Sequence, residues 1–309
     1  MDKILVIGAC GQLGSELTVA LRNSFGSDNV IAADKQNEAP QINGGPFVKL
    51  DILDSQRVAE VIRKHNITQV YHLVALLSAT AENSYQFAWK LNMDSLLSIL
   101  EMAKEGLIRK VYWPSSIAAF GPNTPSINTP QHCVMDPNSV YGISKLAGER
   151  WCEYYNSKFN VDVRSLRYPG LIGYQSLPGG GTTDYAVDIY FKARAKEDYE
   201  CFLDKGTFLP MMYMSDAVRA TIELMEAKSE AVKIRSSYNI NAMSFDPDMI
   251  YRSILSHVPE FKIRYKPDFR QEIADSWPQS IDDSAARSDW QWNHEYDLDK
   301  MTDEILRNI

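Results

Sequence analysis

A short apolar segment followed by three regularly spaced glycines is the most constraining feature of this sequence. Residues 3–7 are mostly β-branched and apolar, as in a buried strand of a parallel sheet. Gly8, Gly11 and Gly14 follow, and leucines at helical spacing continue from position 13. Glycines let the backbone approach a pyrophosphate, and the start of a helix offers free N–H groups and the positive end of its dipole. The segment predicts a strand, a phosphate-binding turn and a helix, although a tight turn without a ligand has the same pattern.

An acidic residue follows at the distance expected for dinucleotide binding. Asp34 ends the next apolar segment, residues 30–34, and lies twenty residues beyond Gly14. A carboxylate at this place accepts hydrogen bonds from the adenosine ribose hydroxyls and repels a 2′-phosphate, so it favours NAD over NADP. Lys35 beside it is discordant and leaves some use of NADP open. The predicted cofactor-binding residues of this region are Gly8, Gly11, Gln12, Leu13, Gly14, Asp34 and Lys35.

Strand-like and helix-like segments alternate over the first half of the chain. Strands are predicted at 47–51, 69–77, 110–114 and 161–168, and helices at 84–106 and from residue 140 onward. This alternation predicts an α/β fold with a Rossmann-like, doubly wound parallel sheet. Ligands of such sheets bind at the carboxyl ends of the strands, so we expect the site there.

Charge and length exclude several classes of protein. The 309 residues carry a net charge of −8 and a pI near 5.2, which argues against nucleic acid or an anionic membrane as a partner. The most apolar strand, residues 70–77, is far too short to span a bilayer. Because no basic segment followed by an apolar run leads the chain, we expect a cytoplasmic protein.

Cysteines and histidines are dispersed along the chain and have none of the spacings of a disulfide framework or a zinc site. We therefore predict no metal. The cysteines are Cys10, Cys133, Cys152 and Cys201, and the histidines are His65, His72, His132, His257 and His294.

Tyr141 and Lys145 lie four residues apart in a helix-forming segment that residues 136–139 precede with turn and N-cap side chains. On a helix the Lys145 ammonium would lie near the Tyr141 hydroxyl, whose unperturbed pKa is about 10. Lowering that pKa by three units takes about 4 kcal/mol, which one cation at ~4 Å supplies at an effective dielectric constant of ~20. Tyr141 is therefore a candidate general base, and Lys145 is the group expected to lower its pKa.

Two serines distinguish this pair from others with the same spacing. Ser115 and Ser116 follow the strand at 110–114, at the carboxyl end where ligands bind. A hydroxyl there would hold a substrate alcohol while Tyr141 takes its proton. The same spacing recurs at Tyr154 and Lys158 and at Tyr296 and Lys300, where exposed pairs on helices explain it.

Ser116, Phe120, Gly121, Tyr141 and Lys145 together resemble the motifs of the extended short-chain dehydrogenase/reductase superfamily. The resemblance implies an NAD-binding domain at residues 1–174 with a returning segment at about 206–242. It also implies a smaller, discontinuous substrate-binding lobe at 175–205 and 243–309, and a homodimer formed through the helix at 84–106 and the helix carrying Tyr141.

The same resemblance adds expected cofactor contacts, and two of them have plain alternatives. Asp51 is equally explained as a turn residue at a strand end, and Asn92 as a polar helix residue facing water. The added residues are Asp51 and Ile52 beside the adenine, Leu73 and Ala75 under the cofactor, Asn92 ordering the active site, and Tyr168, whose turn covers the nicotinamide.

Residues 167–173 and 178–186, with 76–82, are similar to L-threonine 3-dehydrogenases of the short-chain type. This resemblance implies NAD-dependent, metal-independent oxidation of the 3-hydroxyl of L-threonine to 2-amino-3-ketobutyrate. Trp277 would close over the amino acid, or else pack under a loop. The expected substrate contacts are Ser78, Ser115, Ser116, Tyr141, Gly180, Gly181, Thr182, Thr183 and Trp277.

Two other functions stay open on the sequence. A sugar-nucleotide epimerase or dehydratase uses the same scaffold. A non-catalytic NAD-sensing regulator would keep the fold and bind a protein, although it has no need of a tuned tyrosine.

Overall fold

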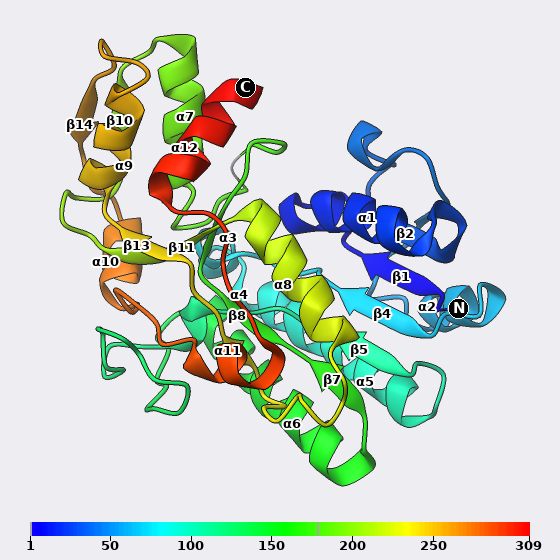
Figure 1. Cartoon of the computed structure of the whole chain (residues 1–309). Helices are drawn as coiled ribbons and strands as arrows, with labels where there is room; N and C mark the ends of the chain where they lie inside the picture. Colours follow the sequence, from blue (N-terminus) through cyan, green and yellow to red (C-terminus); the bar gives the residue numbers. More distant parts are fainter. Residues whose placement is uncertain (1, 178) are drawn as a thin grey trace.

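A six-stranded parallel sheet forms the centre of the computed structural model, which describes residues 2–177 and 179–309 (Figure 1). The strand order reverses between β1 and β4, which is the switch point where dinucleotides bind in Rossmann folds. The predicted α/β class is therefore confirmed. In sheet order the strands are β3 Phe47–Lys49, β2 Val30–Asp34, β1 Ile4–Ile7, β4 Gln69–His72, β5 Lys110–Tyr112 and β7 Asp162–Arg164.

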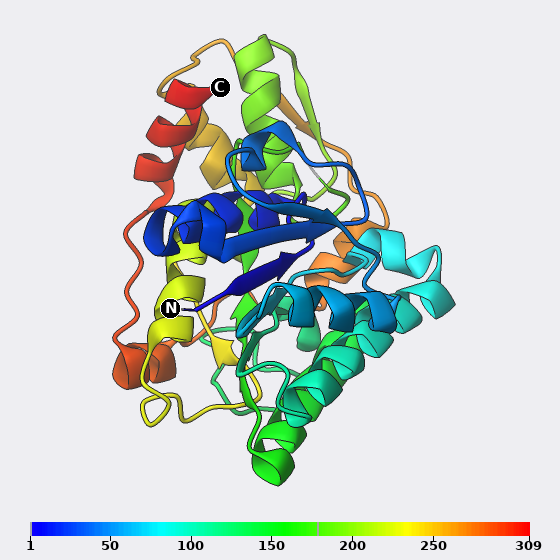
Figure 2. The ribbon, with the colours of Figure 1, turned by 90° about the vertical axis from the view of Figure 1, so that its right-hand side faces the viewer.

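Helices cover both faces of this sheet (Figure 2). Leu17 and Leu21 of α1 pack with Leu224 of α8 on one face, while Val58 of α2 and Ile99 of α5 pack on the other. The helices are α1 Gln12–Phe25, α2 Ser55–Lys64, α3 Ser78–Glu82, α4 Tyr85–Trp89, α5 Ser95–Lys104, α6 Val140–Phe159, α7 Tyr185–Ala195, α8 Met214–Glu226, α9 Pro247–Leu255, α10 Arg270–Asp275, α11 Ser284–Trp290 and α12 Leu298–Asn308.

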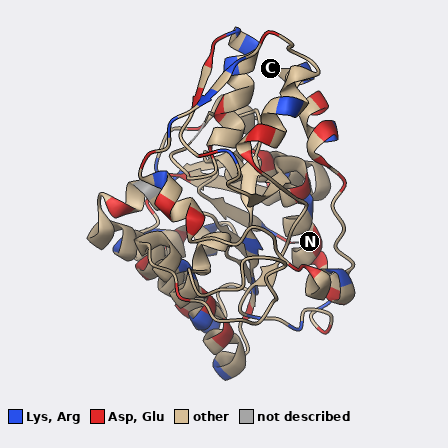
Figure 3. Ribbon diagram, turned by 90° about the vertical axis from the view of Figure 1, so that its left-hand side faces the viewer, with Lys and Arg blue, Asp and Glu red and all other residues tan. Residues whose placement is uncertain are grey.

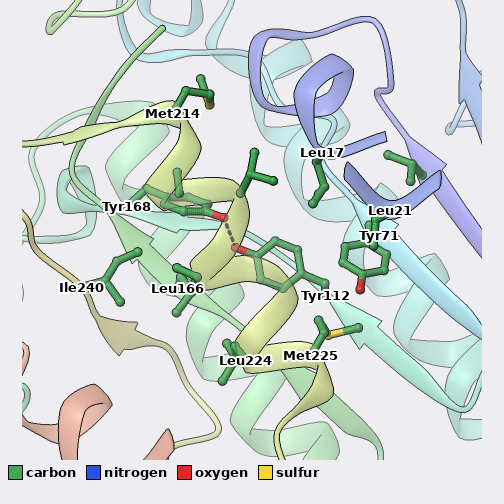
Figure 4. Packing of buried hydrophobic residues seen from close by; sticks show 14 of the residues in the cluster. Leu17, Leu21, Tyr71, Tyr112, Leu166, Tyr168, Met214, Leu224, Met225 and Ile240 are labelled. Carbon is green, nitrogen blue, oxygen red and sulfur yellow. Dashed lines mark hydrogen bonds between the residues drawn. The ribbon is translucent and has the colours of Figure 1, made fainter. Parts of the chain in front are cut away.

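A chain of hydroxyl groups runs through the core between the sheet and α8 (Figure 4). The Tyr112 hydroxyl donates to the Tyr168 hydroxyl at 2.6 Å. Tyr168 in turn bonds to Thr221, whose hydroxyl donates to the Ala217 carbonyl oxygen at 2.7 Å. These bonds satisfy three buried hydroxyls and fix the end of β8 against α8.

Three smaller sheets connect the central sheet to the rest of the chain. The segment predicted as one strand at 161–168 divides at Ser165, and its second half leaves the central sheet for another. Met212 and Tyr213 end strand β11, where they pair with β9 in a fully buried strand directly before α8. The sheets are β12 Tyr238–Asn239, β8 Leu166–Tyr168 and β6 Ser115–Ser116; β13 Met243–Phe245, β11 Leu209–Tyr213 and β9 Gly170–Ile172; and β10 Tyr199–Cys201 with β14 Ile263–Tyr265.

The carboxyl-terminal segment does not pack entirely within the predicted substrate-binding lobe. Helices α9 and α12 contact each other and α7, as a separate lobe requires. Ala286, Trp290 and Trp292, however, lie in the buried cluster of α1 and α8. The chain therefore returns at α11 to pack with α1 and α8 before it ends in α12. The division into an NAD-binding domain at 1–174 and a lobe that includes 243–309 stays a prediction, and this packing joins part of 243–309 to the NAD-binding side.

The predicted long helix at 84–106 contains a short π-helical segment. Residues Lys90–Asp94 are π-helical between α4 and α5. Insertions of this kind are frequent at functional sites because they turn one side chain away from the ordinary helical face. Here the segment carries Asn92.

In Figure 3, Lys and Arg residues are interspersed with Asp and Glu residues over the elements that the view shows. Among the helices of the described residues, none has both the length and the apolar composition needed to cross a membrane.

Candidate active site

A cavity of about 500 Å³ opens at the carboxyl ends of the central strands. It joins the turn after β1, the segment after β4, the serines of β6 and the start of α6, as the switch-point rule predicts. Its predicted lining residues are Gly8, Gly11, Gln12, Leu13, Gly14, Leu73, Ala75, Ser78, Ser115, Ser116, Tyr141, Lys145, Tyr168, Gly181, Thr182, Thr183 and Trp277. Six further predicted residues are not among the described residues of its wall: Asp34, Lys35, Asp51, Ile52, Asn92 and Gly180.

The glycine turn has the geometry of a dinucleotide cradle. Gly8 has φ of +89°, a conformation that favours glycine. A Cβ on Gly14 would lie 2.1 Å from the Gly8 carbonyl oxygen, so only glycine lets α1 approach the turn this closely. The buried Gln12 Nε2 has no hydrogen-bond partner within residues 2–177 and 179–309 and is an available donor. The turn therefore fits the pyrophosphate of NAD.

Tyr141 lies in the first turn of α6, where the Ser139 side chain caps the helix by accepting from the Gly142 N–H at 3.1 Å. Burial raises the pKa of Tyr141 to about 12, and a hydrogen bond with the Ser116 side chain opposes that shift. The net shift of this pKa is therefore upward, and the expected lowering by Lys145 stays a prediction. The simple Coulomb estimate left out the desolvation of the phenolate, which is the larger effect here.

Lys145 is buried and its ammonium has other partners. Its Nζ donates to the Pro114 carbonyl oxygen at 2.5 Å and lies 4.5 Å from the centre of the Trp113 ring and 5.3 Å from that of Tyr141. Burial lowers the pKa of Lys145 to about 7. The lysine is therefore close to the Tyr141 ring, as its spacing predicted, but a backbone carbonyl orients it.

Ser115 and Ser116 have different roles in the structure. The Ser115 hydroxyl donates to Glu149 Oε1 at 2.6 Å, and Glu149 forms a buried ion pair with Arg167 at 2.7 Å. The Ser115 proton is therefore committed to Glu149, so this hydroxyl can only accept a hydrogen bond from a substrate, and its contact with the substrate stays a prediction. Ser116, which hydrogen-bonds Tyr141, is the serine available to a reacting hydroxyl.

A sequence profile described as the NAD dependent epimerase/dehydratase family matches residues 4–241. The chain belongs to this family. An uncharacterized epimerase/dehydratase from Staphylococcus saprophyticus is 48% identical over 100% of this chain and 97% of its own length. The family binds NAD, and the glycine cradle described above fits that cofactor.

Solved structures similar to this family member carry a narrower description. The holo form of an L-threonine dehydrogenase from Cupriavidus necator is 53% identical, with a TM-score of 0.97 over 99% of both chains. A structure described as a monomeric L-threonine 3-dehydrogenase from a metagenome, in its apo form, is 44% identical, with a TM-score of 0.95 over 99% of this chain and 98% of its own.

Asn92 supports the site from behind the cavity wall. Its side chain is buried, accepts from the Leu76 N–H at 2.8 Å and donates to the Ser144 hydroxyl at 3.1 Å. Ser144 donates to the Tyr141 carbonyl oxygen at 2.7 Å. Asn92 therefore joins the segment after β4 to α6 and does not face water. It is not among the described residues that line the cavity, and its direct contact with the cofactor stays a prediction.

The predicted adenine-side residues lie outside the cavity. Both carboxylate oxygens of Asp34 accept backbone N–H groups at 3.0 Å, from Cys10 and from Gln36. Lys35 is exposed, Ile52 is buried, and Asp51 accepts the Leu53 N–H at 3.0 Å as a turn residue does. Their contacts with the adenosine part of NAD stay predictions.

Several of the expected substrate residues lie in or next to the short loop at residues 179–181. Ser78 and Thr182 are buried and their hydroxyls lie 3.3 Å apart. Trp277 lines the cavity and also packs in a buried cluster of the lobe, and its contact with the amino acid stays a prediction. The Gly180 and Gly181 N–H groups, predicted to bind the substrate, both donate to Asp184 instead. Pro178 of the predicted loop lies outside the described residues.

Sequence reasoning missed three charged residues that shape this site. Glu149 lies four positions after Lys145 and so shares its helical face, which was a usable signal. Arg167 was visible as a charge within an apolar strand. Asp184 directly follows the expected substrate contacts Thr182 and Thr183, which was a usable signal. Within the described chain, no group of three or more His, Cys, Asp or Glu side chains has an arrangement that could hold a metal ion.

His72 is the last residue of β4 and directly precedes Leu73 of the cavity wall. It is fully buried, its Nε2 lies 2.8 Å from the Ser95 hydroxyl, and its Nδ1 has no partner in the described part of the chain. Burial, together with the charge of Lys145, lowers the pKa of His72 to about 3. The imidazole is therefore neutral in the folded protein at physiological pH.

Replacing His72 by Asn is expected to reduce the loss of folding stability that occurs at acidic pH. Between the ordinary pKa of about 6.5 and the folded value, only the unfolded chain binds the proton. Stability therefore falls by up to about 1.4 kcal/mol per pH unit as pH drops below ~6.5, and the variant lacks this loss. Urea unfolding at several pH values measures it, with the exposed His132→Asn as control. Parallel profiles for wild type and His72→Asn would contradict a neutral buried imidazole.

Proposed function

We propose that this protein is an NAD-dependent L-threonine 3-dehydrogenase that oxidises the 3-hydroxyl to give 2-amino-3-ketobutyrate, NADH and a proton. One observation carries the proposal: the cavity that contains the glycine cradle also contains the hydrogen-bonded Ser116 and Tyr141 side chains, with Lys145 beside them. This is the arrangement that an alcohol oxidation needs. The names of the similar structures supply the substrate.

The residues of this chain perform the proton transfer. Ser116 donates a hydrogen bond that holds the substrate hydroxyl, and Tyr141, as phenolate, removes the hydroxyl proton. NAD, when bound at the glycine turn, supplies the nicotinamide ring that accepts the hydride from carbon 3. Because burial raises the Tyr141 pKa, any cation near the phenolate strengthens the base, and the Lys145 ammonium is the nearest protein candidate.

The part of the cavity lined by Ser78, Thr182 and Thr183, called here the substrate chamber, offers hydroxyl groups to the amino acid. No arginine is among the described residues that line the cavity. Ser78, Thr182 and Thr183 line the cavity from α3 and from the residues before α7. Hydroxyls both donate and accept, so this group suits a zwitterion with one carboxylate and one ammonium. Trp277 provides an apolar wall. Ser78, Thr182 and Thr183 are the proposed contacts of the polar groups of the substrate.

The deciding assay is NADH absorbance after mixing the purified protein with NAD and L-threonine, with L-allo-threonine and L-serine as controls and with a strong chelator in a parallel sample. Threonine-dependent NADH formation that survives chelation is expected. No signal with any of these amino acids, combined with a rise in melting temperature on adding UDP-sugars, would assign the protein to the sugar-nucleotide enzymes. Binding of NAD without turnover of any alcohol would favour the regulator.

Replacing Asp34 by Ala is expected to weaken NAD binding about tenfold and to reduce discrimination against NADP. The side chain ends β2 and holds the Cys10 N–H of the glycine turn, so the variant loses both a ribose acceptor and the negative charge that repels a 2′-phosphate. Dissociation constants for NADH and NADPH, measured by fluorescence, test this. An unchanged ratio of the two constants would mean that another residue reads the ribose.

We infer that the protein forms a homodimer in the cytoplasm through α4 and α6. Tyr85 and Trp89 of α4 and Ile143 of α6 are exposed and line one apolar hollow, and an exposed apolar surface of this kind marks an interface. Phe87 of α4 is exposed as well. The similar metagenome enzyme is described as monomeric, so the mass in solution is the test. A monomer at micromolar concentration in light scattering would reject the dimer.

A further inference from the structure

One buried carboxylate organises the loop between β9 and α7. Asp184 is only 7% exposed, and its Oδ2 accepts the N–H groups of both Gly180 and Gly181 at 2.8 Å. A hydrogen bond from the Gly179 backbone also reaches this side chain. Asp184 immediately precedes α7, but its carboxylate turns back to the loop and does not cap the helix. Three consecutive backbone donors therefore converge on one side chain.

The backbone at this loop is shaped for that contact. Gly180 has φ of +93°, which other residues rarely adopt. A Cβ on Gly181 would come within 2.9 Å of Asp184 Oδ1, so a side chain there would push the carboxylate away. A Cβ on Gly180 would lie 3.2 Å from Thr80 Oγ1, so the loop also lies close to α3. Both glycines are thus required by the conformation that Asp184 holds.

This loop is a wall between two cavities. Gly179 and Gly181 line the catalytic cavity, while Gly180 lines a second cavity of about 500 Å³ on the lobe side, and Asp184 borders both. The second cavity is lined by Asp188, Glu200 and Arg270 among other charged groups. Without the hydrogen bonds to Asp184, little separates the substrate chamber from a charged, water-accessible space.

We propose that Asp184 is a positioning residue that keeps the glycine loop closed over the substrate chamber, so that the affinity for the amino acid depends on it and the affinity for NAD does not. The inference rests on the proposed function for the identity of the substrate. It follows from placement: the loop carries on directly into Thr182 and Thr183, the proposed substrate contacts, whereas the glycine turn for NAD forms a separate part of the same cavity wall, between β1 and α1. The charge of Asp184 makes its backbone hydrogen bonds stronger than those of a neutral acceptor.

The test compares Asp184→Ala and Asp184→Asn with Asp188→Asn, one turn along α7. Asp188 borders the second cavity but has no part in the proposed substrate chamber, so its variant should keep wild-type kinetics. Asp184→Ala is expected to raise the KM for L-threonine at least ~10-fold, while kcat falls less than about threefold. Asp184→Asn keeps an oxygen acceptor without charge, so it should fall between wild type and Asp184→Ala.

A second measurement does not depend on turnover. Amide hydrogen exchange at the segment containing Gly180 and Gly181 should speed up in Asp184→Ala and not in Asp188→Asn. The NADH dissociation constant should stay within about twofold of wild type in all three variants. Unchanged exchange or an unchanged KM in both Asp184 variants would overturn the proposal, as would an equal loss of threonine and NADH affinity in Asp184→Asn. If wild type lacks activity with threonine, the proposed function fails, while the exchange result still decides whether Asp184 holds the loop.

Discussion

Tyr141→Phe is expected to reduce turnover with L-threonine by at least ~10³-fold while the NADH dissociation constant stays within about twofold of wild type. The change removes one oxygen and keeps the ring, and general bases of this kind contribute about 10²–10⁴-fold. Ser116 remains, so the substrate hydroxyl is still held but its proton has no acceptor. Initial rates of NADH formation and NADH fluorescence measure the two quantities.

Tyr154→Phe is the matched control for this variant. Tyr154 lies on the same helix, four residues before Lys158, and is exposed. It has the spacing of the catalytic pair without the cavity, so its loss should leave turnover within about twofold of wild type. Near-normal turnover in Tyr141→Phe would reject the general base.

The pH dependence of the rate follows from the same tyrosine. Because burial raises the pKa of Tyr141 to about 12, its phenolate fraction in the cofactor-free enzyme increases about tenfold per pH unit through neutrality. The wild-type kcat/KM should therefore rise with pH above 7. Loss of the Lys145 charge, whose pKa lies at about 7, makes that rise shallower. Residual activity of Tyr141→Phe should lack the rise.

Local spacing predicted the catalytic residues better than it predicted their partners. Tyr141 and Lys145 share a helical face, and that relation depends only on residues four apart in sequence. The partner of the lysine, the Pro114 carbonyl oxygen, comes from a segment 31 residues away, and its position is set by the packing of β6 against α6. No sequence pattern contains that information.

The roles of Ser115 and Ser116 could be predicted only in part from the sequence. Neighbouring residues on a strand point to opposite sides, yet Ser115 and Ser116 both line the cavity. Their difference depends on Glu149, which accepts the Ser115 proton and is itself paired with Arg167. Ser116 is therefore the serine whose proton can be donated to a substrate hydroxyl.

The fold was predictable where strands are continuous and apolar. β1, β2 and β4 were found from apolar runs, since parallel strands buried on both faces need them. Strand β11 was not predicted, because it is defined by its pairing with β9, some forty residues earlier in the sequence. Short strands are defined by their partners more than by their own residues.

Arg167→Met is expected to cost about 3–5 kcal/mol of stability, a larger loss than in the other variants described here. Arg167 donates to both carboxylate oxygens of Glu149, at 2.8 and 2.7 Å, and both side chains are almost completely buried. Removing the arginine leaves a buried carboxylate whose hydrogen-bond partner among the described residues is the Ser115 hydroxyl alone, and unpaired buried charges are costly in this range. The midpoint of urea unfolding measures the loss.

Two controls separate charge burial from lost packing. Arg150→Met breaks the exposed pair with Glu153 on the same α6 and should change stability by less than about 1 kcal/mol. A double variant, Arg167→Met with Glu149→Leu, removes both charges and should recover much of the loss, because a buried ion pair replaced by apolar side chains is often near neutral. Failure to recover would assign the cost to the other bonds of Arg167, which donates to the Gln131 carbonyl oxygen and to Asn239. Recovery of stability without recovery of turnover would show that the pair also sets the position of Ser115, and through it that of the neighbouring Ser116.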